Sequence, residues 1–136
     1  MIQLILGLKG SGKTKKLLNL VNDEVEKTKG QVVFIDDDKR YMYDVKHQVR
    51  FVDVKDYALK GADQLYGLVC GMLAQNFDIS EIFIDAFLKI SNCELAEAEL
   101  LLKKLESLAD KSNVKMVISV SADEKDASDY IKQLMI

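Results

Sequence analysis

The sequence contains no proline and no tryptophan, and its 136 residues include only seven glycines, two cysteines and one histidine. Without proline or a low-complexity tract, no segment has the composition of an interdomain linker, so we expect a single domain over residues 1–136. The two cysteines, Cys70 and Cys93, lack the paired spacing of a metal site. We therefore expect reduced thiols in the core rather than a disulfide or a zinc centre.

Positive charge is also scarce. The 19 lysines and arginines are outnumbered by 22 aspartates and glutamates, which gives a net charge of −3, and only Arg40 and Arg50 carry guanidinium groups. A nucleic-acid-binding surface needs clustered lysine and arginine to displace counterions from the phosphates. We therefore expect no nucleic-acid partner.

Long hydrophobic runs are missing as well. The apolar stretch at residues 65–74 is about half the length that crosses a bilayer. The apolar opening at residues 1–8 has neither the basic flank nor the cleavage site of a signal peptide. We expect no membrane partner and a cytoplasmic location.

Apolar segments of two kinds alternate along the chain. Short, mostly apolar runs at residues 2–6, 32–36, 49–54, 81–85 and 114–120 are typical of strands that are buried on both faces. Between them, and after the last, apolar residues recur every three or four positions, as on one face of a helix. The members of these four helical patterns are Leu17, Val21 and Val25; Leu65, Val69 and Met72; Leu95, Ala98, Leu102, Leu105 and Ala109; and Ala127, Tyr130, Ile131 and Leu134. This alternation predicts an α/β fold, a three-layer α/β/α sandwich around a mostly parallel five-stranded sheet.

Two local features refine this prediction. The S-x-x-E patterns at residues 91–94 and 121–124 predict that Ser91 and Ser121 cap the amino-terminal ends of two helices. Residues 41–45, YMYDV, alternate like a half-exposed strand that pairs with residues 49–54 in a hairpin. The intervening KHQ has no turn glycine, so a loop is the favoured alternative.

Three of the seven glycines fall in the octet GLKGSGKT, residues 7–14, which matches G-x-x-x-x-G-K-[ST] without a gap. An apolar strand leads into the octet and an amphipathic helix leaves it. Glycines at positions 7 and 12 permit a tight backbone wrap, so that N–H groups between Gly10 and Thr14 can point at phosphate oxygens beside the positive end of the helix dipole. The octet therefore predicts a phosphate-binding loop.

Over about the first thirty residues the sequence resembles the P-loop NTPases. The resemblance implies a P-loop NTPase core that binds ATP and Mg²⁺, with Lys13 as a catalytic residue that bridges the β- and γ-phosphates and Thr14 as a metal ligand. Lys9 either reaches the γ-phosphate or is a solvated loop lysine; it stands four residues before Lys13, whereas the signature lysine of the ParA-like motif stands five before. The residues expected to contact the nucleotide are Gly7, Lys9, Gly10, Ser11, Gly12, Lys13 and Thr14.

A magnesium–nucleotide site in these families also needs an aspartate at the end of a hydrophobic strand, the Walker B residue. IFID ends at Asp85 and VVFID ends at Asp36, and both aspartates are expected at the carboxyl edge of the sheet, where ligands of open α/β folds bind. We favour Asp85, because the family usually takes this residue from a later strand. Asp36 is the alternative metal ligand.

The residue after Asp85 bears on hydrolysis. In the division of the family that includes RecA-like and secretion ATPases, a glutamate at or near this position orients the attacking water, but here Ala86 follows. We expect slow ATPase activity, unless residues 36–38 or a partner supply the base. Ser119 fits the polar sensor position of that division. The guanine signature N-K-x-D is absent, since ADEKD stands there instead, which favours ATP over GTP.

Two fainter resemblances concern other segments. The acidic run DDDKRY, residues 36–41, is either a solvated loop or a set of contacts to Mg²⁺ or substrate. With the strand before it, this run is similar to a segment of the thymidine kinases that carry a zinc-bearing lasso, although their four cysteines and their glutamate are missing. The octet also resembles that of pilus-retraction and type II secretion ATPases, whose histidine box has no counterpart here beyond His47. A hexameric motor is not expected.

The expected function is that of an ATP-binding P-loop protein with weak or partner-dependent ATPase activity. One alternative is a non-catalytic, nucleotide-dependent switch that binds a protein partner or forms a homo-oligomer; the leucine-rich helix at residues 95–109 would be its surface unless that helix packs in the core. The other alternative is a small-molecule or nucleoside kinase, to which the carboxylates of residues 36–38 would contribute.

Overall fold

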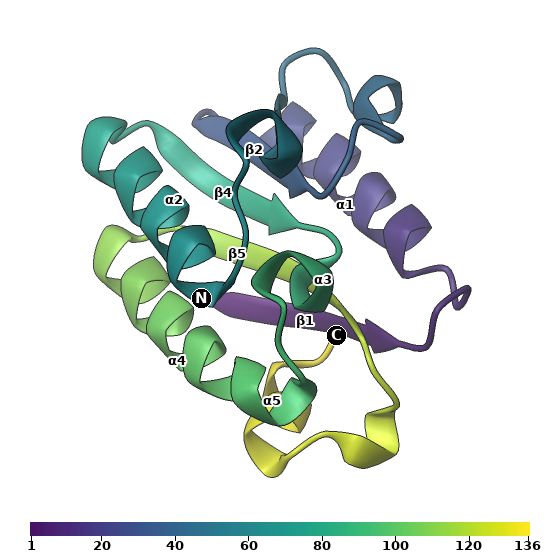
Figure 1. Ribbon diagram of the computed structural model, residues 1–136. Coiled ribbons are helices and arrows are strands. Elements are labelled where there is room, and N and C mark those ends of the chain that lie inside the picture. The colour runs from purple at the N-terminus through teal and green to yellow at the C-terminus, as the bar shows by residue number, and fades with distance from the viewer.

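The computed structural model describes residues 1–136 and contains one five-stranded sheet and five α-helices (Figure 1). The strands are β1 (Ile2–Gly7), β2 (Gln31–Asp36), β3 (Arg50–Asp53), β4 (Ile79–Ile84) and β5 (Lys115–Ser121). The helices are α1 (Lys13–Lys27), α2 (Ala62–Gln75), α3 (Phe87–Ser91), α4 (Leu95–Ser112) and α5 (Asp129–Leu134), and short 3-10 turns lie at Met42–Asp44, Val54–Tyr57 and Glu124–Asp126.

All neighbouring strands of the sheet are parallel, in the order β1-β5-β4-β2-β3. The strand β5 therefore lies between β1, which leads into the octet, and β4, which ends next to Asp85. Because all five strands run the same way, their carboxyl ends lie along a single edge of the sheet. The predicted five-stranded parallel sheet is confirmed.

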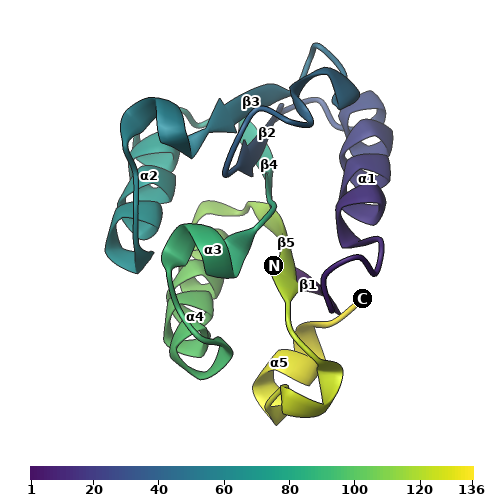
Figure 2. The ribbon, with the colours of Figure 1, turned by 45° about the vertical axis from the view of Figure 1, so that its right-hand side comes forward.

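Helices cover both faces of this sheet, so the predicted three layers are present (Figure 2). On one face α1 places Leu17 and Val21 against Phe34 and Phe83. On the other face α2, α3, α4 and α5 bury a larger apolar cluster against alternate strand residues such as Ile84. The strands are apolar on both faces for this reason.

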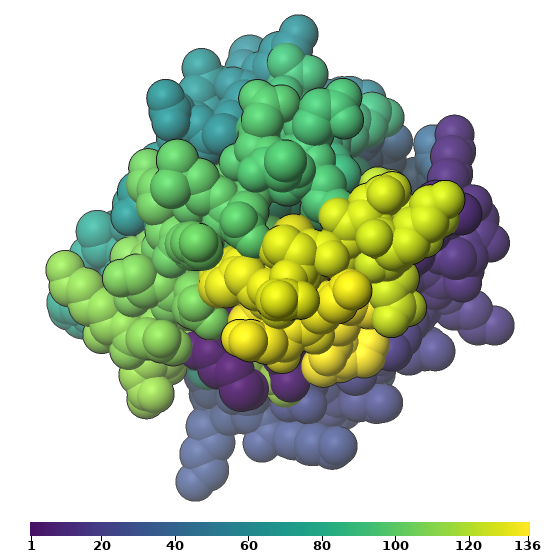
Figure 3. Space-filling model, turned by 90° about the horizontal axis from the view of Figure 1, so that it is seen from below, coloured from purple at the N-terminus to yellow at the C-terminus, as the bar shows by residue number.

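The carboxyl-terminal residues cover the outer edge of β1. Met135 forms a parallel bridge with Leu4, and the N–H of Ile136 donates to the Leu4 carbonyl at 2.9 Å. In Figure 3 this segment, in yellow, lies between the green helix α4 and the purple amino-terminal residues. The outer side of the edge strand β1 is thus partly paired with the carboxyl-terminal residues.

Two local predictions were wrong. Ser91 ends α3 and donates to the Phe87 carbonyl at 2.8 Å, while α4 is capped by a box formed by Glu94 and Glu97. Ser121 is the last residue of β5, and the helix that follows is capped by Ser128. In each case another residue caps the helix: Glu94, three residues after Ser91, caps α4, and Ser128, seven residues after Ser121, caps α5. The S-x-x-E pattern alone cannot decide which of several polar residues is the cap.

The disfavoured alternative of a strand at residues 41–45 is not observed. The segment contains the 3-10 turn Met42–Asp44 and forms no hairpin, so the favoured loop is confirmed. Asn22 of α1 holds this connection in place: its side-chain amide donates to the Asp44 carbonyl at 2.8 Å, and its oxygen accepts from the Lys46 N–H at 2.9 Å. The alternation was misleading because the loop is fixed from α1 rather than by strand pairing.

The leucine-rich face of α4 packs in the core. Ala98, Leu102, Leu105 and Ala109 are all buried in the larger cluster, so this face is not available as the partner surface of a switch. Cys70 and Cys93 are free thiols, but both are only half-buried, at the margin of the core rather than within it. None of the helices is both long enough and apolar enough to cross a membrane.

Two leucines of α4 provide a matched test of this packing. The Leu102 side chain is 0% exposed and Leu100 is 70% exposed. We expect Leu102→Ala to lower the free energy of unfolding by about 3 kcal/mol, because it removes apolar burial and leaves a cavity. Leu100→Ala should change it by less than about 0.5 kcal/mol. Urea denaturation measures both, and similar losses in the two variants would contradict the assignment of this face to the core.

Candidate functional site

The octet forms a loop whose shape requires glycine. Between the end of β1 and the start of α1, Gly10 and Gly12 have φ angles of 83° and 89°, in the left-handed region that strains other residues. A Cβ atom added at Gly7 would lie 3.2 Å from the Ser11 Cβ and closer still to the Ser11 hydroxyl. The Ser11 N–H donates to the Leu8 carbonyl at 3.0 Å and tightens the turn. Gly7 and Ser11 thus shape the loop.

Several N–H groups of this loop are left without a protein acceptor. Those of Gly10, Gly12 and the first residues of α1, Lys13 to Lys15, donate to no protein oxygen; the first helical bond is that of the Lys16 N–H to the Gly12 carbonyl, at 3.1 Å. Unsatisfied N–H groups and the dipole of a 15-residue helix give this end of α1 a positive potential. The loop can therefore hold an anion.

The side chain of Lys13 folds back over the loop. Its ammonium group donates to the Leu8 carbonyl at 3.0 Å. Burial lowers the pKa of Lys13, and the charge of Asp85 acts against this shift. Lys9 is exposed on the rim of the same cleft. Lys13 is thus placed beside the free N–H groups, with further N–H bonds of its own to offer.

A chain of hydrogen bonds connects α1 to the carboxyl ends of β4 and β5. The Thr14 hydroxyl donates to Oδ2 of Asp85 at 3.0 Å, and the Ser119 hydroxyl donates to Oδ1 of the same carboxylate. The N–H of Ala86 donates in turn to the Ser119 oxygen at 3.3 Å. Asp85 and Ser119 are both buried. Both oxygens of Asp85 are therefore fixed, one of them by the last residue of the octet.

Asp36 lies at the same edge of the sheet, one strand further along. The N–H of Asp85 donates to the Ile35 carbonyl at 2.9 Å, which places the two strand ends side by side. Asp36 is only 2% exposed; its Oδ1 accepts the Asp37 N–H at 2.7 Å, but its buried Oδ2 has no partner. Burial and the nearby carboxylates of Asp37 and Asp85 raise the pKa of Asp36 to about 8, although the hydrogen bond from the Asp37 N–H acts in the opposite direction.

The rest of the acidic run is held by ion pairs. The Asp37 carboxylate lies 2.7 Å from the Lys89 ammonium of α3; burial alone would raise the pKa of Asp37, but Lys89 outweighs it and the pKa is lowered. Lys39 pairs with Asp53 at the end of β3, at 2.8 Å. Residues 36–41 are thus a loop anchored at several points, of which Asp36 and Asp37 are largely covered.

One cleft of about 670 Å³ connects the octet with the acidic run. Lys13 and Thr14 line it together with Asp36, Asp37 and Asp85. The cleft is also lined by Arg40 and Tyr41 of the acidic run, and by Lys15, Leu88, Lys89 and Ser121, which were not assigned to the site from the sequence. Lys89 could not have been found from the sequence, because the five-residue helix α3 that carries it has no periodic signal. Ser121 had been assigned to a cap.

The donor set around Thr14 suits a hard divalent cation. The Thr14 hydroxyl, the Asp85 carboxylate and the unpartnered Oδ2 of Asp36 are oxygen ligands, and Mg²⁺ prefers oxygen ligands in combination with phosphate. The residues present therefore fit a magnesium-bound phosphate group.

No protein-family model matches the sequence, and no curated protein matches it either.

The raised pKa of Asp36 predicts a pH dependence of stability. The folded state keeps this proton up to a pH of about 8, whereas the unfolded chain releases it near the ordinary value of 3.8. The unfolded chain therefore binds fewer protons over this interval, and the free energy of unfolding falls as the pH rises. Between pH 5 and pH 8 we expect the wild type to lose about 3.5 kcal/mol more than Asp36→Asn, which has no such proton.

Urea denaturation without Mg²⁺ over this pH range measures the difference. Asp38→Asn is the control, because Asp38 is less buried and its carboxylate already accepts the Arg40 N–H at 2.8 Å. Parallel pH profiles for the wild type and Asp36→Asn would refute the raised pKa.

Proposed function

We propose that this protein binds ATP with Mg²⁺ through a P-loop NTPase core, and that its hydrolysis of ATP is slow or depends on a partner. One observation carries the proposal: the hydrogen bond of 3.0 Å between the Thr14 hydroxyl and the Asp85 carboxylate, 71 residues apart. It brings the last residue of a glycine-rich loop to an aspartate at the end of a hydrophobic strand. The octet resembles Walker A, and Asp85 stands where that resemblance requires the Walker B aspartate.

The residues around this bond have separable roles. The free N–H groups of the loop and the Lys13 ammonium bind phosphate oxygens, and Thr14 with Asp85 holds the cation. Mg²⁺, when bound, neutralises phosphate charge and orients the phosphate chain. Ser119 is a positioning residue, because it donates to Oδ1 of Asp85 and so turns Oδ2 toward Thr14.

The geometry favours Asp85 over Asp36 as the metal-binding aspartate. Asp85 is bonded directly to Thr14, while Asp36 contacts no residue of the octet through a hydrogen bond. Asp36 lies beside Asp85 and completes the acidic side of the cleft. It is the nearest carboxylate with a free oxygen, and its side chain is the one available substitute for the missing glutamate.

A second candidate function rests on the same carboxylate. The cleft continues past the octet to Arg40 and Tyr41, which leaves space beside the phosphate-binding loop for a small acceptor molecule. Asp36, whose own proton a cation bound beside it would displace, would then accept a hydroxyl proton from that acceptor, as the base of a small-molecule kinase does.

The first test of the proposal is binding. By calorimetry, ATP with Mg²⁺ should bind the wild type, and Lys13→Ala should weaken its affinity at least about tenfold, because an ammonium–phosphate contact is lost. Lys16→Ala is the matched control: Lys16 lies one turn further along α1 and donates to the Ile136 carbonyl at 3.3 Å, so it should retain the wild-type affinity within about twofold. A wild type that binds no ATP would end the proposal.

The second test restores the missing base. Ala86 lines the cleft directly after Asp85, so Ala86→Glu should raise ATP turnover at least about tenfold, since a positioned general base contributes about 10² or more. Ala86→Gln has the same size without the basic carboxylate and should not raise it. Equal turnover in the two variants would argue against slow hydrolysis caused by the missing base. ADP release that requires an added nucleoside or small alcohol would favour the kinase.

A further inference from the structure

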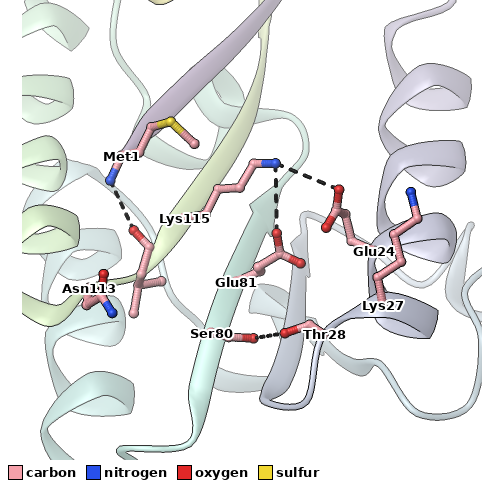
Figure 4. A pocket seen from close by; sticks show the side chains of 9 residues that line it. Met1, Glu24, Lys27, Thr28, Ser80, Glu81, Asn113 and Lys115 are labelled. Carbon is pink, nitrogen blue, oxygen red and sulfur yellow. Dashed lines mark hydrogen bonds and ion pairs between the residues drawn. The ribbon is translucent and has the colours of Figure 1, made fainter.

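A second pocket lies at the opposite edge of the sheet from the octet (Figure 4). It has a volume of about 460 Å³ and opens between the carboxyl-terminal half of α1 and the amino ends of β4 and β5. Glu24 and Lys27 line it from α1, and Glu81 and Lys115 line it from the strands. This pocket lies near the carboxyl-terminal end of α1 and the amino-terminal end of β4, whereas the cleft beside the octet lies at the opposite ends of these two elements. The nucleotide proposed above would therefore not reach it.

Glu81 is an unusual residue for its place. It sits on the central strand β4, paired in register with Val32 on one side and with Lys115 on the other, and its side chain is only 8% exposed. Its buried Oε2 has no hydrogen-bond partner. Burial raises the pKa of Glu81, and the neighbouring Glu24 raises it further. An apolar residue here would stabilise the sheet more, so the carboxylate is retained at a cost in stability.

The nearest cation does not satisfy Glu81. The Lys115 ammonium lies 3.9 Å from the Glu81 carboxylate and 3.8 Å from that of Glu24, too far for a hydrogen bond to either. Figure 4 shows the two carboxylates on either side of this ammonium, with Glu81 pointing toward α1 and Glu24 facing it from the helix. Lys27, on the rim, forms no ion pair. Two carboxylates thus share one loosely placed cation.

The other wall of the pocket is polar but already satisfied. The hydroxyls of Thr28 and Ser80 lie 2.8 Å apart and bond to each other. The buried atom of the pocket that is left without a partner is an acceptor, Oε2 of Glu81, whereas the ammonium groups of Lys27 and Lys115 are open to solvent. A ligand that satisfies this atom must bring an N–H or O–H donor.

We propose that this pocket binds a guanidinium group, with Glu81 and Glu24 as its acceptors. A guanidinium offers five N–H donors in one plane and pairs with carboxylates in a fixed geometry. A divalent cation is disfavoured, because the Lys115 ammonium, about 4 Å from both carboxylates, repels its double charge twice as strongly as the single charge of a guanidinium, and because it brings no N–H donor for Oε2 of Glu81. An anion would leave Oε2 of Glu81 unpaired. A free small molecule and an arginine of a protein partner are the two sources of such a guanidinium, and the chemistry is shared.

The test is a titration followed by ¹⁵N NMR at pH 8, with methylguanidinium as the probe and no nucleotide present. We expect saturable shifts centred on the amides of Glu81 and Lys115. Glu81→Gln should weaken binding at least about tenfold, because it removes the buried charge. Glu26→Gln is the matched control, since Glu26 lies on α1 but pairs with Lys46 at 2.9 Å outside the pocket, and it should bind like the wild type.

Three further arms decide what is recognised. Tetramethylammonium carries charge without N–H donors and should not bind; if it binds as well as methylguanidinium, the inference fails. An arginine-containing tetrapeptide that binds more tightly than methylguanidinium assigns the pocket to a protein partner, and equal or weaker binding assigns it to a free cation. The absence of any saturable shift with either guanidinium probe overturns the inference and leaves the ATP proposal untouched.

A thermal unfolding scan distinguishes ligand binding from a purely structural role of Glu81. Since the carboxylate is buried with an unpartnered oxygen, Glu81→Gln should unfold at the same temperature as the wild type or at a higher one. A lower midpoint would show that Glu81 serves the fold through Lys115, and would overturn the inference.

Discussion

The hydrogen bond between Thr14 and Asp85 exists because of the order of the strands. The octet follows β1, and Asp85 follows β4, two positions across the sheet, with β5 between them. Parallel strands bring every carboxyl end to one edge, and α1 leaves that edge with Thr14 in its first turn. Ser119, at the carboxyl end of β5, bridges the interval by bonding to Asp85. A sheet with antiparallel strands would separate these groups, so the site depends on the parallel topology.

Much of this arrangement was predictable from the sequence, and the reason is physical. Continuous apolar runs identify strands covered on both faces, and the octet marks where a strand turns into a helix around unsatisfied N–H groups. What the sequence did not reveal depends on contacts between distant segments. Lys89 reaches Asp37 only because α3 turns back over the acidic run, and Ser121 lines the cleft because the following residues bend away before their helix begins. Neither event has a periodic signature.

Buried carboxylates mark both ends of the sheet. Asp36 at the carboxyl edge and Glu81 at the amino edge each keep one oxygen buried without a partner, in strands whose other inward positions are apolar. Such groups lower stability, and proteins tend to retain them where a ligand or a reaction needs them. Asp53 is the instructive contrast: it too is buried, but Lys39 pairs with it and its pKa is lowered in spite of that burial. Burial alone therefore does not single out Asp36 and Glu81; the missing partner does.

The position of Ala86 shows why an absent glutamate need not mean a damaged site. Ala86 has a φ of 55°, in the left-handed region, where a residue other than glycine costs about 1 kcal/mol. That conformation ends β4 and starts α3, and it directs the Ala86 N–H to Ser119, which in turn holds Asp85. The backbone at this position thus supports the Asp85 carboxylate, whichever side chain it carries. The proposed site keeps this support while lacking the base, which favours holding a magnesium-bound phosphate over splitting it as its proposed role.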